Sequence, residues 1–205
     1  MTKNDKILNL GCGNSRLSEE LSEEGYEDIT NIDFSTKVIT IMEEKCKAKF
    51  PKMSFKVMDV LDMKEFQDEE FNVVFDKALL DSVLCGENAL DTVKNMMKEI
   101  YRVLVDEGFY IIVSNSDEST RKELFDENLW EYNFCEIGKP TKIIVIDEKD
   151  KDPKNFHYIY ILKKKVDEEK RKAKLAKLEE EARKKEAEKA NKKHKKKKKA
   201  GASNK

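Results

Sequence analysis

The chain has 205 residues, of which 39% are hydrophobic and 40% are charged, so its length fits one ordinary domain and an appendage. Residues 1–162 carry 21 basic and 34 acidic side chains, whereas residues 163–205 carry 20 and 8, so a near-neutral total hides an acidic body and a basic tail. Because no apolar run approaches the roughly 18 residues of a membrane span, we expect no membrane partner and a cytoplasmic location, with a nuclear one left open by the basic tail.

Cysteine and histidine spacing is unlike that of a metal centre. The four cysteines lie far apart, at Cys12, Cys46, Cys85 and Cys135, and the chain has only two histidines. Structural zinc and disulfide frameworks need closer or more regular spacing. We therefore expect reduced thiols and no metal.

Short apolar runs and helical patterns alternate along the body. Strands are predicted at residues 7–10, 29–32, 55–58, 71–75 and 109–113, and helices at 17–24, from the cap Ser35 to before Pro51, and within 88–104. Three further strand-like runs, at 130–137, 142–146 and 157–162, follow with less helix between them. This order predicts an α/β fold with a doubly wound, mostly parallel sheet and an antiparallel edge.

Ligands of such sheets bind at the carboxyl ends of the strands, where several acids and glycines fall. Gly11 and Gly13 follow the first predicted strand, and Asp33, Asp59 and Asp76 stand where later strands end. A lone Gly-x-Gly pair also fits a simple tight turn. Asp33, however, lies 22 residues after Gly11, the spacing at which an acid accepts hydrogen bonds from ribose hydroxyls.

The third glycine of a dinucleotide-binding turn is replaced by Arg16, which favours adenosine without a pyrophosphate. Asp59 is a candidate acceptor for the adenine amino group, and Phe34 or Val60 is a candidate cover for the ring. The alternative for Asp59 is a cap or turn residue.

Four segments carry a family resemblance: ILNLGCGNSRLSEEL, NIDFS, MDV and FDKALLDSVLCGE. They resemble the class I S-adenosylmethionine-dependent methyltransferases and, within these, the branch that methylates lysines of translation elongation factor 1 alpha. The resemblance covers about residues 6–163. It implies a Rossmann-like seven-stranded sheet, S-adenosyl-L-methionine as cofactor, and a protein substrate, with elongation factor 1 alpha as the candidate. The cofactor contacts that it implies are Gly11, Gly13, Asp33, Phe34, Asp59, Val60 and Lys77.

Methyl transfer to lysine requires a neutral, aligned amine, whereas lysine in water has a pKa near ~10.4. Desolvation beside a positive sulfonium favours the free amine. Asp76 and Asp81 are the acids best placed to hold or orient that amine, and we take them as the catalytic candidates. The alternatives are an N-cap or helix-face carboxylate for Asp81 and a plain surface lysine for Lys77.

Three departures from the family pattern bear on activity. Asn9 stands where many methyltransferases have an acid, and Ala78 and Leu79 replace a usual Gly-Thr pair. Six residues precede the first strand, where family members carry an aromatic segment that closes over the cofactor. A truncated gene model, a compensating element and a weakened site remain open, and the last would make the chain a methyltransferase-like binding subunit without activity.

The last strands and the tail complete the prediction. Aromatic residues gather in these strands, and core packing is favoured over a substrate border. They are Trp130, Tyr132, Phe134, His157, Tyr158 and Tyr160. We divide the chain into a domain, 1–165, and a tail, 166–205, that is helical and then a disordered polylysine block. RNA or ribosome contact through the tail and a merely solubilising role are both open.

Overall fold

The computed structural model describes residues 1–138 and 156–166, and, beyond these, residues 168–169, 171–173, 175–176, 180 and 183–184. The chain divides into two compact units, Met1–Lys165 and Val166–Lys205. The strand expected at 142–146 lies outside the described residues. Within the described residues, no helix has the length and apolar character needed to cross a membrane.

The described part of the first unit forms one seven-stranded sheet in the order β3-β2-β1-β4-β5-β7-β6. Its strands are β1 Ile7–Leu10, β2 Ile29–Asp33, β3 Ser54–Val57, β4 Phe71–Lys77, β5 Leu104–Ser114, β6 Trp130–Gly138 and β7 Phe156–Lys164. Strands β1 to β5 run parallel, and β7 is antiparallel to both β5 and β6. The predicted doubly wound sheet with an antiparallel edge is therefore confirmed.

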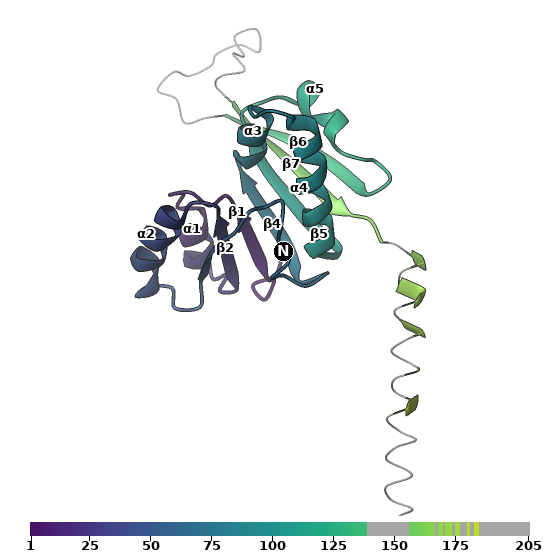
Figure 1. Cartoon of the computed structure of the whole chain (residues 1–205), viewed down its shortest axis with the longest axis horizontal. Coiled ribbons are helices and arrows are strands. Elements are labelled where there is room, and N and C mark those ends of the chain that lie inside the picture. Colours follow the sequence, from purple (N-terminus) through teal and green to yellow (C-terminus); the bar gives the residue numbers. More distant parts are fainter. Residues whose placement is uncertain are drawn as a thin grey trace, which may run out of the picture. The chain divides into compact units, whose positions relative to one another are not determined.

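Helices connect most of the parallel strands (Figure 1). They are α1 Leu17–Glu23, α2 Thr36–Lys47, α3 Leu79–Leu84, α4 Ala89–Val103 and α5 Glu118–Arg121, followed by the 3₁₀ turn η1 Lys122–Leu124. Ser35 caps α2 as expected, because its hydroxyl accepts a hydrogen bond from the Val38 N–H at 3.4 Å. The short helices α3 and α5 were not predicted.

Both faces of the sheet bury apolar side chains, as a parallel sheet requires. On one face, the periodic apolar residues of α4 pack against β1, β2, β4 and β5, and this cluster includes Leu10, Val74, Met96, Ile100 and Tyr110. On the other face, Leu21 of α1 packs against Ile7, Ile29 and Val73. Figure 1 shows α1 and α2 beside β1 and β2, and α4 over the β5 side of the sheet.

The end of α4 differs from the prediction. The helical pattern was expected to run to Leu104, but this residue begins β5, so the strand is longer than the predicted run 109–113. Lys164, which the charge count placed in the basic tail, is buried and donates to the carbonyls of Tyr101 and Leu104 at 2.9 and 2.7 Å. A lysine thus satisfies carbonyl groups at the carboxyl end of the helix.

The aromatic residues of the last strands pack as the favoured interpretation expected. Trp130, Tyr158 and Tyr160 are buried in the main core, and Tyr132 and Phe134 pack against it. Phe134 lies 5.3 Å from Tyr160 between ring centroids. These rings therefore stabilise the antiparallel edge of the sheet.

The strand order defines where a ligand site can lie. β1 is flanked by β2 on one side and β4 on the other, and the chain leaves β1 toward β2 but leaves β4 toward β5. Such a reversal opens a crevice outside the carboxyl ends of the two strands. Gly11 follows β1 and Lys77 ends β4, so the predicted site residues fall at this crevice.

Candidate functional site

The turn after β1 requires its glycines. Gly11 and Gly13 have φ angles of +53° and +51°, which residues with a side chain rarely adopt. A Cβ at Gly11 would lie 3.0 Å from Cδ1 of Leu79, the first residue of α3, whereas a Cβ at Gly13 would meet only the Gly11 carbonyl oxygen at 3.9 Å. The turn therefore touches α3 on one side and leaves its backbone open to a ligand on the other.

Asp33, at the end of β2, holds this turn in place. Its Oδ2 accepts from the Gly13 N–H and its Oδ1 from the Ser35 N–H, both at 2.9 Å. Each carboxylate oxygen has two acceptor positions, so two remain after these bonds. Two acceptors on one carboxylate match a vicinal diol such as that of ribose, which is the role predicted for Asp33.

Apolar and acidic side chains lie exposed beside Asp33. Phe34 is 80% exposed, an unusual state for a large aromatic side chain, and Val60 is partly buried against the core. Asp59 is exposed, and its Oδ1 accepts from the Leu61 N–H at 2.9 Å, so it serves as the turn residue named as its alternative role. Contacts from these three residues to an adenine ring stay predictions.

Asp76 lies at the end of β4 as predicted, but its side chain is buried instead of facing an acceptor. The side chain has no exposed surface and accepts from the Leu79 N–H at 2.7 Å, the Leu80 N–H at 3.0 Å and the Tyr110 hydroxyl at 2.9 Å. Burial raises the pKa of Asp76 to about 6, although these hydrogen bonds oppose the rise. An incoming amine cannot touch a fully buried carboxyl group, so the structure makes Asp76 a residue that positions α3.

The turn between β4 and α3 carries backbone strain. Ala78 has a φ of +68°, in the left-handed region, at the place where the resemblance has glycine. Lys77 just before it is exposed, which suits either a contact with a cofactor carboxylate or the plain surface role. A left-handed alanine costs on the order of 1 kcal/mol relative to glycine.

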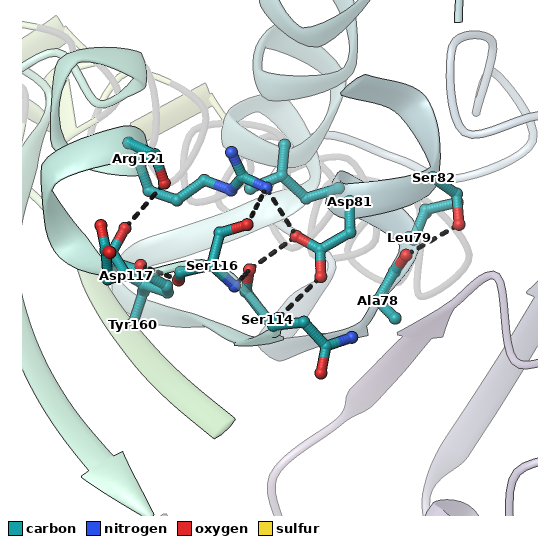
Figure 2. Close-up of polar contacts among 12 residues, drawn as sticks. Ala78, Leu79, Asp81, Ser82, Ser114, Ser116, Asp117, Arg121 and Tyr160 are labelled. Atoms are coloured by element: carbon teal, nitrogen blue, oxygen red, sulfur yellow. Dashed lines mark hydrogen bonds and ion pairs between the residues drawn. The ribbon is translucent and has the colours of Figure 1, made fainter. Parts of the chain in front are cut away.

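Asp81 of α3 lies at the centre of a polar network (Figure 2). Its Oδ1 accepts from the Ser114 hydroxyl at 2.5 Å and from Nη2 of Arg121 at 3.0 Å, and its Oδ2 accepts from the Asn115 N–H at 2.8 Å. Burial would raise the pKa of Asp81, but the bonds from Ser114, Asn115 and Arg121 outweigh it and hold the pKa below its ordinary value. Asp81 is therefore an ionised, partly exposed carboxylate. It lies in the first turn of α3 and is not its N-cap, so its place fits the helix-face alternative as well as the predicted role.

Asn9 takes part in the core rather than in an exposed charge site. Its Nδ2 donates to the Ser18 hydroxyl and to Oδ1 of Asn31, both at 3.0 Å, which ties α1 to β1 and β2.

Cys12 is also buried, and burial raises the pKa of its thiol to about 12, so the thiol stays protonated. The described residues hold no group of three or more side chains suited to bind a metal ion.

The site thus combines an open glycine turn, a carboxylate with unused acceptor positions, an exposed aromatic ring and a fixed carboxylate at a topological switch point. These features are typical of a doubly wound domain whose ligand site lies at the carboxyl edge of its sheet. A family model described as a methyltransferase domain matches residues 1–200, so the chain belongs to the methyltransferase domain family.

Named relatives and solved structures agree with this assignment. The eEF1A lysine and N-terminal methyltransferase of Bos taurus is 47% identical over 112 residues, which are 54% of this chain and 16% of that protein. The EEF1A lysine methyltransferase 4 of Mus musculus is 31% identical over 138 residues, covering 63% of this chain and 53% of that protein. The chain therefore spans about a sixth of the first relative and about half of the second.

A solved structure shares the fold. A SAM-dependent methyltransferase from Methanosarcina mazei superposes with a TM-score of 0.62 at 19% sequence identity, covering 82% of this chain and 95% of that one. At this identity the likeness shows the fold alone.

Proposed function

We propose that this chain transfers a methyl group from S-adenosylmethionine to an amine of a protein, a lysine or a terminal amine, and that elongation factor 1 alpha is its substrate. The observation that carries the proposal is the carboxyl edge of the sheet, where Asp33, 8% exposed, holds the Gly11–Gly13 turn and has two acceptor positions that these bonds do not use. The relatives whose printed names include eEF1A support the choice of substrate.

The residues at the crevice fit the cofactor in chemical type. Asp33 would accept from the ribose hydroxyls, the backbone of Gly11 and Gly13 would face the amino acid portion, and Phe34 and Val60 would cover the adenine. When bound, S-adenosylmethionine supplies a methyl group on a positively charged sulfur, so the chain needs no covalent nucleophile.

Asp81 is the side chain best suited to meet the acceptor. It follows the end of β4 by four residues, its carboxylate is ionised, and its two oxygens are fixed by α5 and by the end of β5. A fixed acceptor can orient the hydrogens of an entering amine so that the nitrogen lone pair points along the line of transfer. Asp81 need not be a strong base for this role.

The charge of the first unit favours a basic substrate. Residues 1–165 contain 24 basic and 34 acidic side chains, so this unit has a formal charge of −10. A negative surface raises the association rate of positively charged partners and disfavours nucleic acid at the same surface. Lysine-rich surface segments of a protein fit this charge.

Methylation of a purified target tests the proposal. The full chain, incubated with methyl-labelled S-adenosylmethionine and purified elongation factor 1 alpha, should label that protein, and Asp81→Asn should reduce the label while cofactor affinity stays the same. An exposed acid at the opposite end of β2 supplies the control, because Asp28→Asn changes the same charge away from Asp81 and from the predicted cofactor contacts. Label on a small molecule or nucleic acid would exclude the protein-amine assignment. Cofactor binding with no labelled product would favour the alternative of a binding subunit.

A further inference from the structure

Arg121 is an arginine that two acceptors hold inside the site. Its Nη2 donates to Oδ1 of Asp81 at 3.0 Å and to the Ser116 hydroxyl at 2.9 Å, and its side chain is only 12% exposed (Figure 2). The Nε atom is buried and has no hydrogen-bond partner among the described residues. An arginine that gives up solvation for this position must act mainly through its contact with Asp81.

The surroundings of Arg121 are themselves fixed. The Ser116 carbonyl accepts from the Tyr160 hydroxyl at 2.5 Å, and the Ser114 hydroxyl accepts from the Ser116 N–H at 3.0 Å. The segment that leads from β5 to α5 is therefore tied to β7 and to α3 at once. This holds the guanidinium on the Asp81 carboxylate with little freedom to turn away.

Charge balance around Asp81 depends on Arg121. The titratable groups that face the carboxylate are Asp76 on β4, Tyr110 on β5, Tyr160 on β7 and Arg121 on α5. Burial raises the pKa of both tyrosines, so they stay neutral near pH 7. Asp76, with a pKa of about 6, carries a negative charge at that pH in the wild type and in each variant alike. Arg121 is consequently the cation that compensates Asp81 among these groups.

We propose that Arg121 is a positioning residue of the acceptor site, which fixes the Asp81 carboxylate and neutralises its charge so that an entering lysine is bound as the free amine. This inference rests on the proposed function and adds the residue that sets the protonation state of the acceptor. A bare carboxylate would stabilise the ammonium form, which cannot accept a methyl group. The Asp81–Arg121 pair, which has no net charge, orients the amine without stabilising its ammonium form.

The proposal gives a pattern of pH profiles that loss of structure alone would not give. Arg121→Gln keeps a hydrogen-bond donor but removes the charge, so Asp81 should hold the ammonium more strongly. The midpoint of the kcat profile against pH should rise by about one unit or more, since an opposite charge within a few ångströms moves a pKa by roughly 1–3 units. The KM for the acceptor should fall at the same time.

Two more variants complete the test: Asp81→Asn alone, and the double variant that combines Asp81→Asn with Arg121→Gln. Asp81→Asn leaves Arg121 uncompensated, so the kcat midpoint should fall below that of the wild type. The double variant removes the negative charge of Asp81 and the positive charge of Arg121 together, so the net charge of the site equals that of the wild type. The midpoint should therefore return close to the wild-type value even though the maximal rate stays low. Arg121→Lys keeps the charge and should also keep the wild-type midpoint.

The experiment measures kcat and KM of the full chain between pH 6 and 9.5 with labelled S-adenosylmethionine and elongation factor 1 alpha. Arg102→Gln is the matched control, because Arg102 pairs with Glu99 at 2.8 Å on α4 and should leave the midpoint unchanged. Calorimetric cofactor affinity and the melting temperature of each variant show whether it is folded. If Arg121→Gln does not fold, Arg121→Lys replaces it in the test. A shift of the kcat midpoint in pH for the lysine variant would contradict the charge argument.

The outcomes separate the two proposals. A wild type that binds cofactor but labels no protein overturns the proposed function, and the inference falls with it. A wild type that labels the substrate, with equal midpoints in wild type, Arg121→Gln and Asp81→Asn, overturns the inference alone. Midpoints that move in opposite directions in the two single variants and return in the double variant support it.

Discussion

Asp76 gives the protein a pH-dependent stability that one substitution can isolate. Its carboxyl group is fully buried against Tyr110 and the first N–H groups of α3, and burial raises its pKa from 3.8 to about 6. A group whose pKa is higher in the folded state stabilises the fold below its unfolded pKa, and this contribution is lost as the pH rises through the folded pKa. The window is therefore about pH 4 to 6.

The size of the effect follows from the two pKa values. Each unit of difference corresponds to about 1.4 kcal/mol, so ionisation of Asp76 should lower the free energy of unfolding by about 3 kcal/mol across the window. Asp76→Asn removes the titration and keeps plausible partners, because its carbonyl can accept from the helix N–H groups and its amide can donate to the Tyr110 oxygen. The variant should lose this pH dependence without losing the fold.

Urea unfolding between pH 4 and 7, followed by the fluorescence of the buried Trp130, measures the difference. Other carboxyl groups titrate identically in both proteins, so the wild type minus Asp76→Asn difference reports Asp76 alone. That difference should fall by about 3 kcal/mol from pH 4 to pH 7. Parallel curves for the two proteins would refute the conclusion that Asp76 is a buried acid with a raised pKa.

Three further predictions concern strain, a buried cation and the tail. Ala78→Gly should raise the free energy of unfolding by about 1 kcal/mol in urea titrations, whereas Ala48→Gly, at a right-handed position, should lower it. If both substitutions changed the free energy of unfolding in the same direction, Ala78 would not be strained. Lys164→Met should lower the free energy of unfolding by about 2 kcal/mol or more, because two buried carbonyls lose their donor. Lys163→Met, measured in the same urea titrations, should change the free energy of unfolding much less. Deleting residues 166–205, which removes 17 basic and 8 acidic side chains, should leave the thermal midpoint unchanged and abolish any salt-sensitive RNA binding; a fall of many degrees would show that the tail supports the domain.

Local sequence signals were sufficient to predict the parallel sheet and the positions of the candidate site residues at its carboxyl edge. Gly11, Asp33 and the capping Ser35 act within a few residues of a strand end, so apolar runs and turn residues were enough to place them. The order of strand and helix then fixed the parallel part of the fold, because the connections of such sheets follow few rules. The α3 helix was missed because six residues are too few for a periodic pattern.

The remaining features depend on contacts between residues far apart in the chain. Asp76 was placed at the correct strand end, but it shares the face of Val74, which points into the main core, and only the sheet register shows this. Arg121 reaches Asp81 across 40 positions, and Lys164 reaches Leu104 across 60. No local pattern distinguishes such residues from surface cations, so the sequence could not identify them.

Calorimetric titration of the full chain with S-adenosylmethionine tests the central claim, that the crevice after β1 and β2 is the cofactor site. The wild type should bind with one site per chain, and Asp33→Ala should weaken binding by roughly 2–4 kcal/mol, because two hydrogen bonds to a charged acceptor are lost. Asp28→Ala removes an exposed acid just before β2, at the opposite end of that strand from Asp33, and should bind like the wild type when all proteins are folded. No binding by the wild type, or equal affinity in wild type and Asp33→Ala, would contradict the account.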